Sequence, residues 1–178
     1  MNKTKFEPRL TVAGLVVTAG EKYPLIPMHW PEAAAKAGAD NLTTVGGGVL
    51  LHESPIEAMK RELAEEYSVA QSRVFPINHP RFVSHQNGKE YVWCLVVCHT
   101  RPQVVPQAGE VRSVGWYSCP QMLYYGVRQM SEFKQRMFLQ AFISACETYP
   151  EHFGQYVTHV GRLRRLQRKR KSVESART

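Results

Sequence analysis

The sequence lacks the features that mark membrane-spanning, secreted and zinc-binding proteins. It has no run of about 18 consecutive apolar residues, the length that a membrane-spanning helix requires. The first residues, MNKTKFEPRL, contain no apolar core, so we expect no secretory signal there. The four cysteines include no Cys-x-x-Cys pair and the seven histidines no His-x-x-x-His pair, so no zinc site is expected. These absences favour a cytoplasmic protein whose cysteines are buried free thiols.

The composition is that of an ordinary globular domain with a basic end. The 178 residues are 43% hydrophobic and 21% charged, which suits a single domain. The formal net charge is +8, but residues 161–178 contain eight Lys/Arg and one Glu, so this segment has a net charge of +7 and the rest of the chain one of only +1. We expect a domain over residues 1–160 and a basic tail over 161–178 that is disordered or helical. The tail either binds nucleic acid or acidic lipid, or is solvated without a partner.

Hydrophobic patterns and turn signals predict strands and helices that alternate along the chain, which indicates an α/β layered domain. Strands are expected at 9–18, 23–28, 42–45, 81–85, 90–100 and 111–117. Asn87-Gly88 is a strong signal for a hairpin turn between two of them. Helices are expected at 31–40, 54–67 and 131–149.

The clearest of these helices follows three glycines, Gly46 to Gly48. Ser54 is a good N-cap, Pro55 fits the first turn, and Glu57 completes a capping box. Arg61 lies four residues from Glu57 and from Glu65, and both carboxylates are expected to orient it along the helix.

Three carboxylates share one face of this helix beside the glycines. Glu62, Glu65 and Glu66 lie at positions i, i+3 and i+4. Clustered carboxylate oxygens suit Mg²⁺ or Mn²⁺, which proteins hold with one or two carboxylates and substrate phosphates. The alternative is a solvated acidic face, since each like-charge pair costs only about 0.2–0.5 kcal/mol. The neighbouring glycines, which allow a ligand close approach to the backbone, favour a metal site acting on a phosphorylated substrate.

The segment from Gly47 to Val69 resembles the signature of the Nudix hydrolases, G-x5-E-x7-R-E-U-x-E-E-x-G-U, where U is a bulky aliphatic residue. Gly47, Glu53 and the run RELAEEYSV match every fixed position except one, Ser68, where the family has glycine. The resemblance implies an α/β/α sandwich with a mixed β-sheet between helices. It also implies a Mg²⁺-dependent hydrolase, with Mn²⁺ as the alternative metal, that cleaves a diphosphate linkage in a nucleoside diphosphate linked to another moiety X.

The resemblance assigns metal-binding roles to four residues of the helix and loop. Glu65 and Glu66 are expected to be the main metal ligands, with the Gly46 carbonyl as a third. Glu62 is expected either to bind the metal or to position and deprotonate the attacking water.

Three further residues receive supporting roles from the same resemblance. Glu53 is expected to assist the catalytic groups, and Arg61 to fix the helix by pairing with carboxylates. Glu110 stands six residues before Trp116 and is the candidate for an outlying metal ligand or base. The alternative is that Glu110 is an exposed loop glutamate without such a role.

Candidates for substrate contacts lie outside the signature. Trp30, which precedes Pro31, could stack on a nucleotide base, although core packing is the alternative. Arg81 and His85, around the predicted hairpin, could meet phosphates. Ser68 is expected either to adopt the left-handed conformation at a cost of about 1 kcal/mol or to end the helix differently.

The sequence leaves the substrate and the assembly state open. A nucleotide derivative is the expected substrate, and the basic tail raises the alternative of a 5′-end RNA substrate. A non-catalytic nucleotide-binding module is a third interpretation, although none of the signature carboxylates is missing. A monomer and a homodimer are both compatible with the chain.

Overall fold

The computed structural model describes residues 9–21, 24–32, 42–77, 82–84, 88–118, 121–122 and 129–161. The predicted helix over 31–40 lies almost entirely outside these ranges. The substrate candidates Arg81 and His85 and the tail from residue 162 onward also lie outside the described residues.

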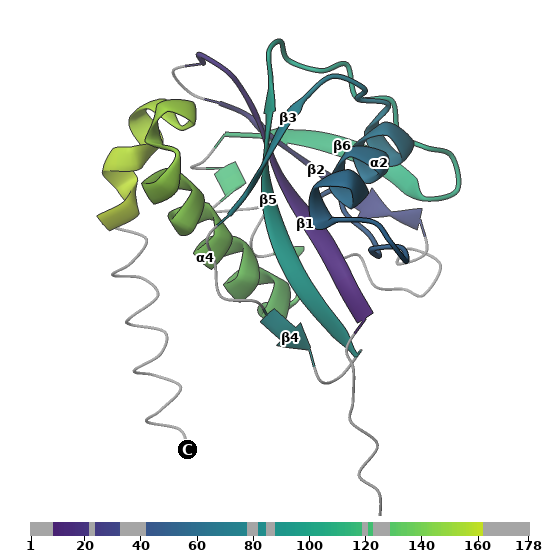
Figure 1. The fold of residues 1–178 in the computed structure, drawn as a ribbon. Helices are drawn as coiled ribbons and strands as arrows, with labels where there is room; N and C mark the ends of the chain where they lie inside the picture. Colours follow the sequence, from purple (N-terminus) through teal and green to yellow (C-terminus); the bar gives the residue numbers. More distant parts are fainter. Residues whose placement is uncertain are drawn as a thin grey trace, which may run out of the picture.

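The centre of the fold is a parallel pair of long strands. β1 (Arg9–Thr18) pairs in parallel with β5 (Lys89–Cys98) along its whole length (Figure 1). β3 (Arg73–Pro76) and the short β4 (Phe82–Ser84) both pair antiparallel with β5. The sheet is therefore mixed, as the sequence predicted, and β4 with β5 forms the predicted hairpin.

A second, two-stranded sheet lies beside the first and is linked to it by the segment 42–49. β2 (Ile26–Pro31) pairs antiparallel with β6 (Val111–Tyr117). His29 and Thr43 exchange backbone hydrogen bonds of 2.9 Å, and Gly14 donates one of 2.8 Å to the Val45 carbonyl. The strand predicted over 42–45 is thus wrong as a regular element, because the segment makes only isolated bridges while passing from one sheet to the other.

Strand alternation gives the central sheet two apolar faces, and one helix covers each (Figure 1). α2 (Pro55–Tyr67) packs Met59 and Leu63 against the face that carries Val12 and Val96. α4 (Glu132–Thr148) packs against the opposite face, which carries residues such as Leu15. The predicted α/β/α sandwich is confirmed.

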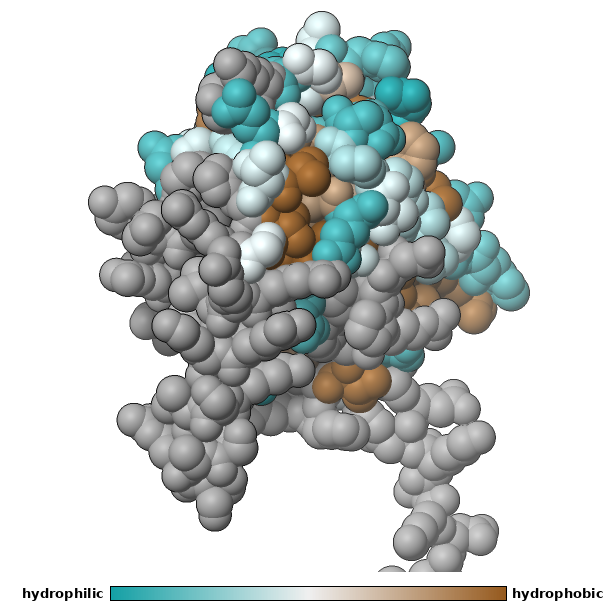
Figure 2. Space-filling view, turned by 90° about the vertical axis from the view of Figure 1, so that its left-hand side faces the viewer, coloured by the Kyte–Doolittle hydropathy of each residue, from teal (hydrophilic) through white to brown (hydrophobic). Residues whose placement is uncertain are grey.

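Two short 3-10 helices close the α4 side of the molecule. η3 (Pro150–His152) and η4 (Gly154–His159) follow α4, and Phe153 and Tyr156 are fully buried in the same core. Where the described residues form the surface in a view of this side, it is mostly hydrophilic, with an apolar area near the middle of the view (Figure 2). No helix in the described part of the chain is long and apolar enough to span a membrane.

Several element limits differ from the prediction. β1 and β6 have the predicted limits, whereas β2 runs from 26 to 31 instead of 23 to 28, and β5 ends at Cys98. β3 was not predicted, since four residues ending in Pro76 show no clear alternation. Cys94, Cys98 and Cys146 are buried free thiols, as expected. Burial raises the pKa of Cys94 to about 12 and that of Cys98 to about 11, so both are inert at neutral pH.

Candidate functional site

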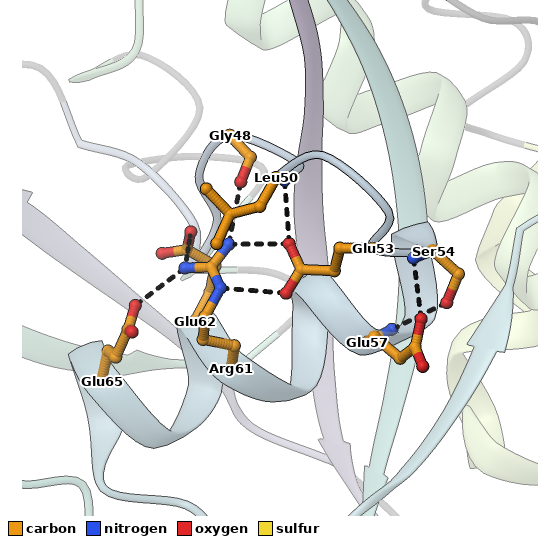
Figure 3. A network of polar contacts seen from close by, with 8 residues as sticks. All are labelled: Gly48, Leu50, Glu53, Ser54, Glu57, Arg61, Glu62 and Glu65. Atoms are coloured by element: carbon orange, nitrogen blue, oxygen red, sulfur yellow. Dashed lines mark hydrogen bonds and ion pairs between the residues drawn. The ribbon is translucent and has the colours of Figure 1, made fainter.

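Helix α2 begins with the predicted capping box. Ser54 Oγ accepts a hydrogen bond of 3.2 Å from the Glu57 amide, and the Ser54 amide donates one of 2.8 Å to the Glu57 carboxylate (Figure 3). The Glu57 carboxylate therefore caps the N-terminus of α2. Its expected pairing with Arg61 is not found among the described contacts, where Arg61 instead contacts other carboxylates.

The glycine loop is pressed between β1 and α2. Gly46 has φ of +153°, and a side chain there would collide with the backbone of Val12 and Ala13. A side chain at Gly47 would collide with the carboxylate of Glu62. Glycine is required at Gly46, because the loop lies directly against the backbone of β1, whereas a side chain at Gly47 would displace the carboxylate of Glu62.

Arg61 gathers three carboxylates and a loop carbonyl around one guanidinium (Figure 3). Its Nε and Nη2 donate to Glu53 at 3.0 and 3.1 Å, and Nη2 also donates to the Gly48 carbonyl at 2.8 Å. Its Nη1 donates to Glu62 at 2.7 Å and to Glu65 at 2.9 Å. These hydrogen bonds lower the pKa of Glu53 and raise that of Arg61. Arg61 thus joins the loop to the helix, as its predicted structural role requires.

Glu66 is buried to the same extent as Glu62. It is 8% exposed, and its Oε2 accepts a hydrogen bond of 3.0 Å from the Gly46 amide. Burial raises the pKa of Glu66 to about 8, and the negative charges of Glu62 and Glu110 add to the shift. Burial also raises the pKa of Glu62, partly offset by Arg61. The buried carboxylates therefore favour an additional cation at this point.

Glu110 belongs to the same group, although it is distant in sequence. The loop that carries it crosses the end of α2, where the Gln107 amide donates to the Glu66 carbonyl at 3.3 Å and the Glu110 amide to the Gln107 carbonyl at 3.3 Å. Its negative charge raises the pKa of both Glu62 and Glu66. The loop that carries Glu110 therefore lies at the end of α2, close enough for the charge of Glu110 to act on Glu62 and Glu66.

The chemistry of the donors fits a hard divalent cation. Carboxylate oxygens are the preferred ligands of Mg²⁺ and Mn²⁺, and Glu65, whose side chain is 47% exposed, is accessible to a phosphorylated substrate. Among the described residues no hydrogen-bond donor contacts the Gly46 carbonyl oxygen. Among the described residues, no three His, Cys, Asp or Glu side chains lie close enough together to bind one metal ion. Glu62 and Glu65 instead form ion pairs with Arg61.

A buried histidine and tyrosine that the sequence did not single out lie behind Glu66. His29 Nδ1 is 3.0 Å from the Tyr67 hydroxyl, and His29 Nε2 is 3.9 Å from Glu66 Oε1. Burial, with a smaller contribution from the charge of Lys134, lowers the pKa of His29 to about 4. The ring is therefore neutral at neutral pH and contacts Glu66 without forming an ion pair. Pairing of β2 with the segment 42–45 brings it there, and no local motif signals this.

Ser68 resolves the single mismatch of the signature. It adopts the left-handed conformation, with φ of 55° and ψ of 30°. Its amide donates to the Ala64 carbonyl at 3.1 Å, and the Val69 amide donates to the Leu63 carbonyl at 3.0 Å. The helix thus ends with the geometry that glycine usually supplies, and the substitution displaces none of the carboxylates.

The remaining substrate candidate is only partly exposed. Trp30, in β2, is half-buried and packs against the core on the α4 side, so its packing role is observed. Its stacking role stays a prediction, as do the phosphate contacts of Arg81 and His85.

Comparison with known proteins covers both the fold and the signature segment from Gly47 to Val69. The family model of the NUDIX domain matches residues 8–141, more than half of the chain. A search of curated proteins finds no match. Many solved structures are similar, all those described below at under 25% sequence identity.

Three of these structures illustrate the similarity. The E. coli dihydroneopterin triphosphate pyrophosphohydrolase is 16% identical, with a TM-score of 0.55 over 75% of this chain and 94% of that chain. The NUDIX domain of Shewanella oneidensis NrtR, complexed with ADP ribose, is 15% identical, with a TM-score of 0.60 over 80% and 91%. A bifunctional NMN adenylyltransferase/ADP ribose pyrophosphatase from Francisella tularensis, complexed with AMP and a Mn ion, is 19% identical, with a TM-score of 0.57 over 79% and 43%. With the family match over residues 8–141, the chain belongs to the Nudix family, whose hydrolases act on phosphoric anhydride bonds.

Proposed function

We propose that this protein is a Mg²⁺-dependent pyrophosphohydrolase that cleaves the diphosphate linkage of a nucleoside diphosphate joined to another moiety X. The observation that carries the proposal is the pair of buried carboxylates beside the glycine loop, Glu62 and Glu66, because burial raises the pKa of both. Buried carboxylates that repel one another favour a divalent cation, and the pyrophosphohydrolase and the AMP- and Mn-bound structure above share this fold.

In this proposal the residues have three roles: some bind the cation, one accepts a proton, and others keep the site in its observed geometry. Glu65 and Glu66, with the Gly46 carbonyl, would hold the cation. When bound, Mg²⁺ supplies positive charge that neutralises phosphate oxygens. Glu62 or Glu110 would accept the proton of the attacking water, whose oxygen bonds to one phosphorus as the bridging oxygen leaves with the other phosphate. Glu53 and Arg61 would keep these groups in place.

Hydrolysis assays with a panel of nucleotide derivatives test the proposal. The panel contains nucleoside triphosphates, nucleotide sugars, dinucleoside polyphosphates, NADH and ADP ribose, each with Mg²⁺, with Mn²⁺ and with a chelator. Glu65→Gln and Glu66→Gln should lower kcat/KM by at least about 100-fold, because they remove metal ligands. Glu147→Gln, an exposed glutamate at the end of α4, is the matched control and should leave activity unchanged. Equal activity of all variants would disprove the metal-binding role.

The basic tail supports an RNA 5′ end as a second substrate class. The seven net positive charges of residues 161–178 lie beyond the NUDIX match and suit a phosphate backbone. Removing 162–178 should reduce hydrolysis of 5′-triphosphate RNA strongly and that of mononucleotides little, and the difference should shrink with added salt. An equal loss on both substrates would exclude this role of the tail.

A further inference from the structure

The side chain of Arg9 lies against the third glycine of the loop, Gly48. Arg9 is the first residue of β1, and its Nη2, Cζ and Nε atoms lie 2.6, 3.0 and 3.0 Å from the position that a β-carbon at Gly48 would take. Gly48 does not have a positive φ, so its backbone would accept other residues. A side chain is excluded there because the Arg9 guanidinium occupies its place.

The Arg9 guanidinium has no partner among the described residues. It is exposed, none of the described carboxylates forms an ion pair with it, and no oxygen accepts a hydrogen bond from its side chain. The other guanidinium at Gly48 belongs to Arg61, which already binds three carboxylates. Arg61 is therefore neutralised, whereas Arg9 can bind an anionic group.

The Gly48 amide offers a second donor beside Arg9. Hydrogen bonds at the neighbouring residues, Gly47 and Val49, join the loop to β1 in an antiparallel bridge. In such a pairing the amide and the carbonyl of the residue between them face away from the partner strand. The Gly48 carbonyl accordingly accepts from Arg61 on this outer side (Figure 3). The Gly48 amide, for which the described part of the chain provides no acceptor, faces the same side.

The two donors are close enough to bind one phosphate group. Since Arg9 Nη2 lies so near the β-carbon position of Gly48, it is at most about 5 Å from the Gly48 amide nitrogen. Hydrogen bonds from a guanidinium to phosphate oxygens are about 2.7–2.9 Å long and are often bidentate. A phosphate that accepts from Arg9 can therefore accept from the amide as well.

The outer side of the loop leads to the buried carboxylates. A β-carbon at Gly47 would collide with the Glu62 carboxylate, so Arg9 Nη2 is at most about 12 Å from that carboxylate. The path between them stays on this side, since Arg61 contacts both the Gly48 carbonyl and Glu62. With Mg²⁺–oxygen distances of about 2.0–2.1 Å, a metal ion and roughly two phosphate groups span this distance. A phosphate chain bound at the metal can therefore place its end at Arg9.

We propose that the Arg9 guanidinium and the Gly48 amide bind the terminal phosphate of a substrate whose phosphate chain ends in a free phosphate group. The inference rests on the proposed function and specifies moiety X as a further phosphate, as in a nucleoside triphosphate or a 5′-triphosphate RNA. A terminal phosphate has three free oxygens and a charge of about −1.5 to −2 at pH 7, which suits a guanidinium together with an amide. A phosphate between two substituents, as in a nucleotide sugar, has fewer free oxygens and less charge.

Nuclear magnetic resonance of the backbone amides, in a chelator, tests the site independently of hydrolysis. ATP and ADP-glucose have the same nucleoside and differ in a terminal phosphate against an uncharged sugar. ATP should shift the Gly48 amide signal and bind at least about tenfold more tightly, because the sugar cannot replace the charged hydrogen bonds. Inorganic triphosphate should shift the same signal. Equal binding of the two nucleotides, or an unshifted Gly48 signal, would overturn the inference.

Substitution of Arg9 separates its contact from a general charge effect. Arg9→Gln should lower the affinity for ATP at least about tenfold and leave that for ADP-glucose nearly unchanged. Arg136→Gln removes an exposed charge on α4 and should change neither. Wild-type affinity for ATP in Arg9→Gln, or an equal loss in Arg136→Gln, would contradict the proposal.

Gly48→Ala tests whether this glycine positions Arg9. The atoms nearest to its methyl group belong to the flexible end of the Arg9 side chain, so the guanidinium should be displaced while the fold is retained. The affinity for ATP should fall as in Arg9→Gln, and the double variant should bind no more weakly than either single variant. Additive losses would show that the two residues do not share one site.

Hydrolysis assays distinguish this inference from the proposed function. Mg²⁺-dependent hydrolysis of ATP that is the same in Arg9→Gln and the wild type would refute the inference alone. Absence of hydrolysis, with the Arg9-dependent shift of the Gly48 signal retained, would refute only the proposed function. A larger loss in Arg9→Gln on 5′-triphosphate RNA than on ATP would assign the site to an RNA end, and the reverse would assign it to a nucleotide.

Discussion

At the scale of single residues, the burial of the Glu66 carboxylate lowers the stability of the fold at neutral pH. Burial raises its pKa from 4.5 to about 8, so the native state keeps a proton that the unfolded state releases above pH 4.5. The free energy of unfolding should therefore fall as the pH rises from about 4.5 to about 8, by an amount on the order of a few kcal/mol. Below pH 4.5 both states hold the proton and the effect disappears.

Glu66→Gln should remove most of this pH dependence, because the amide stays neutral and its oxygen can still accept from the Gly46 amide. In a chelator, thermal unfolding of the variant should occur at a higher temperature than that of the wild type at pH 8, and at a similar temperature at pH 4.5. Adding Mg²⁺ should stabilise the wild type more than the variant. Parallel pH profiles in the chelator would show that Glu66 is not the group responsible.

Ser68 holds a backbone conformation that costs a non-glycine residue about 1 kcal/mol or more. Ser68→Gly removes this cost but increases the entropy of the unfolded chain. The net stabilisation should therefore be about 0.5–1 kcal/mol, whereas Ser68→Val should be destabilising. Urea unfolding measures both. Metal dependence should be unchanged in Ser68→Gly, and destabilisation by glycine would mean that the conformation is unstrained.

At the scale of elements, two adjacent glycines in the loop should respond differently to the same substitution. Gly46→Ala places a methyl group against the backbone of Val12 and Ala13, which cannot move aside, so the protein should fold poorly. Gly47→Ala meets only the carboxylate of Glu62, which can rotate away. That variant should keep its fold but lose about 100-fold in kcat, as expected when a catalytic group is misplaced.

Circular dichroism and hydrolysis assays on both variants check this difference. A folded, fully active Gly47→Ala would show that Glu62 need not occupy its observed position. A Gly46→Ala variant of normal stability would show that the loop can move away from β1.

The elements that could be predicted are those whose signals are local. Ser54 and Glu57 fix the start of α2, and the spacing of Glu62 and Glu66 fixes the face that meets the glycines, so the position of these carboxylates could be predicted from the sequence. Their metal-binding and catalytic roles stay predictions. β3 was missed because its four residues become a strand only through pairing with β5. His29 was missed because strand pairing, and no motif, brings it behind Glu66.

At the scale of the whole molecule, the end of the domain can be tested by truncation. Phe153 and Tyr156 are fully buried in the core that α4 covers, and Val160 is 8% exposed. A chain that ends at residue 161 should therefore unfold at nearly the same temperature as the full chain. A chain that ends at residue 149 should be destabilised by several kcal/mol, because it loses these aromatic side chains. Thermal unfolding followed by circular dichroism measures both, and equal stability of the two would place the domain end before residue 150.

The parallel pairing at the centre of the sheet also governs how the chain can fold. Each residue of β1 pairs with the residue 80 positions later, from Arg9 with Lys89 to Thr18 with Cys98. β1 can join the sheet only when this long loop closes, so a loss of chain entropy precedes the contacts between these two strands. During synthesis, β1 and α2 emerge from the ribosome well before β5. Until β5 is made, both apolar cores lack the strand that contributes Leu95 to one and Val96 to the other.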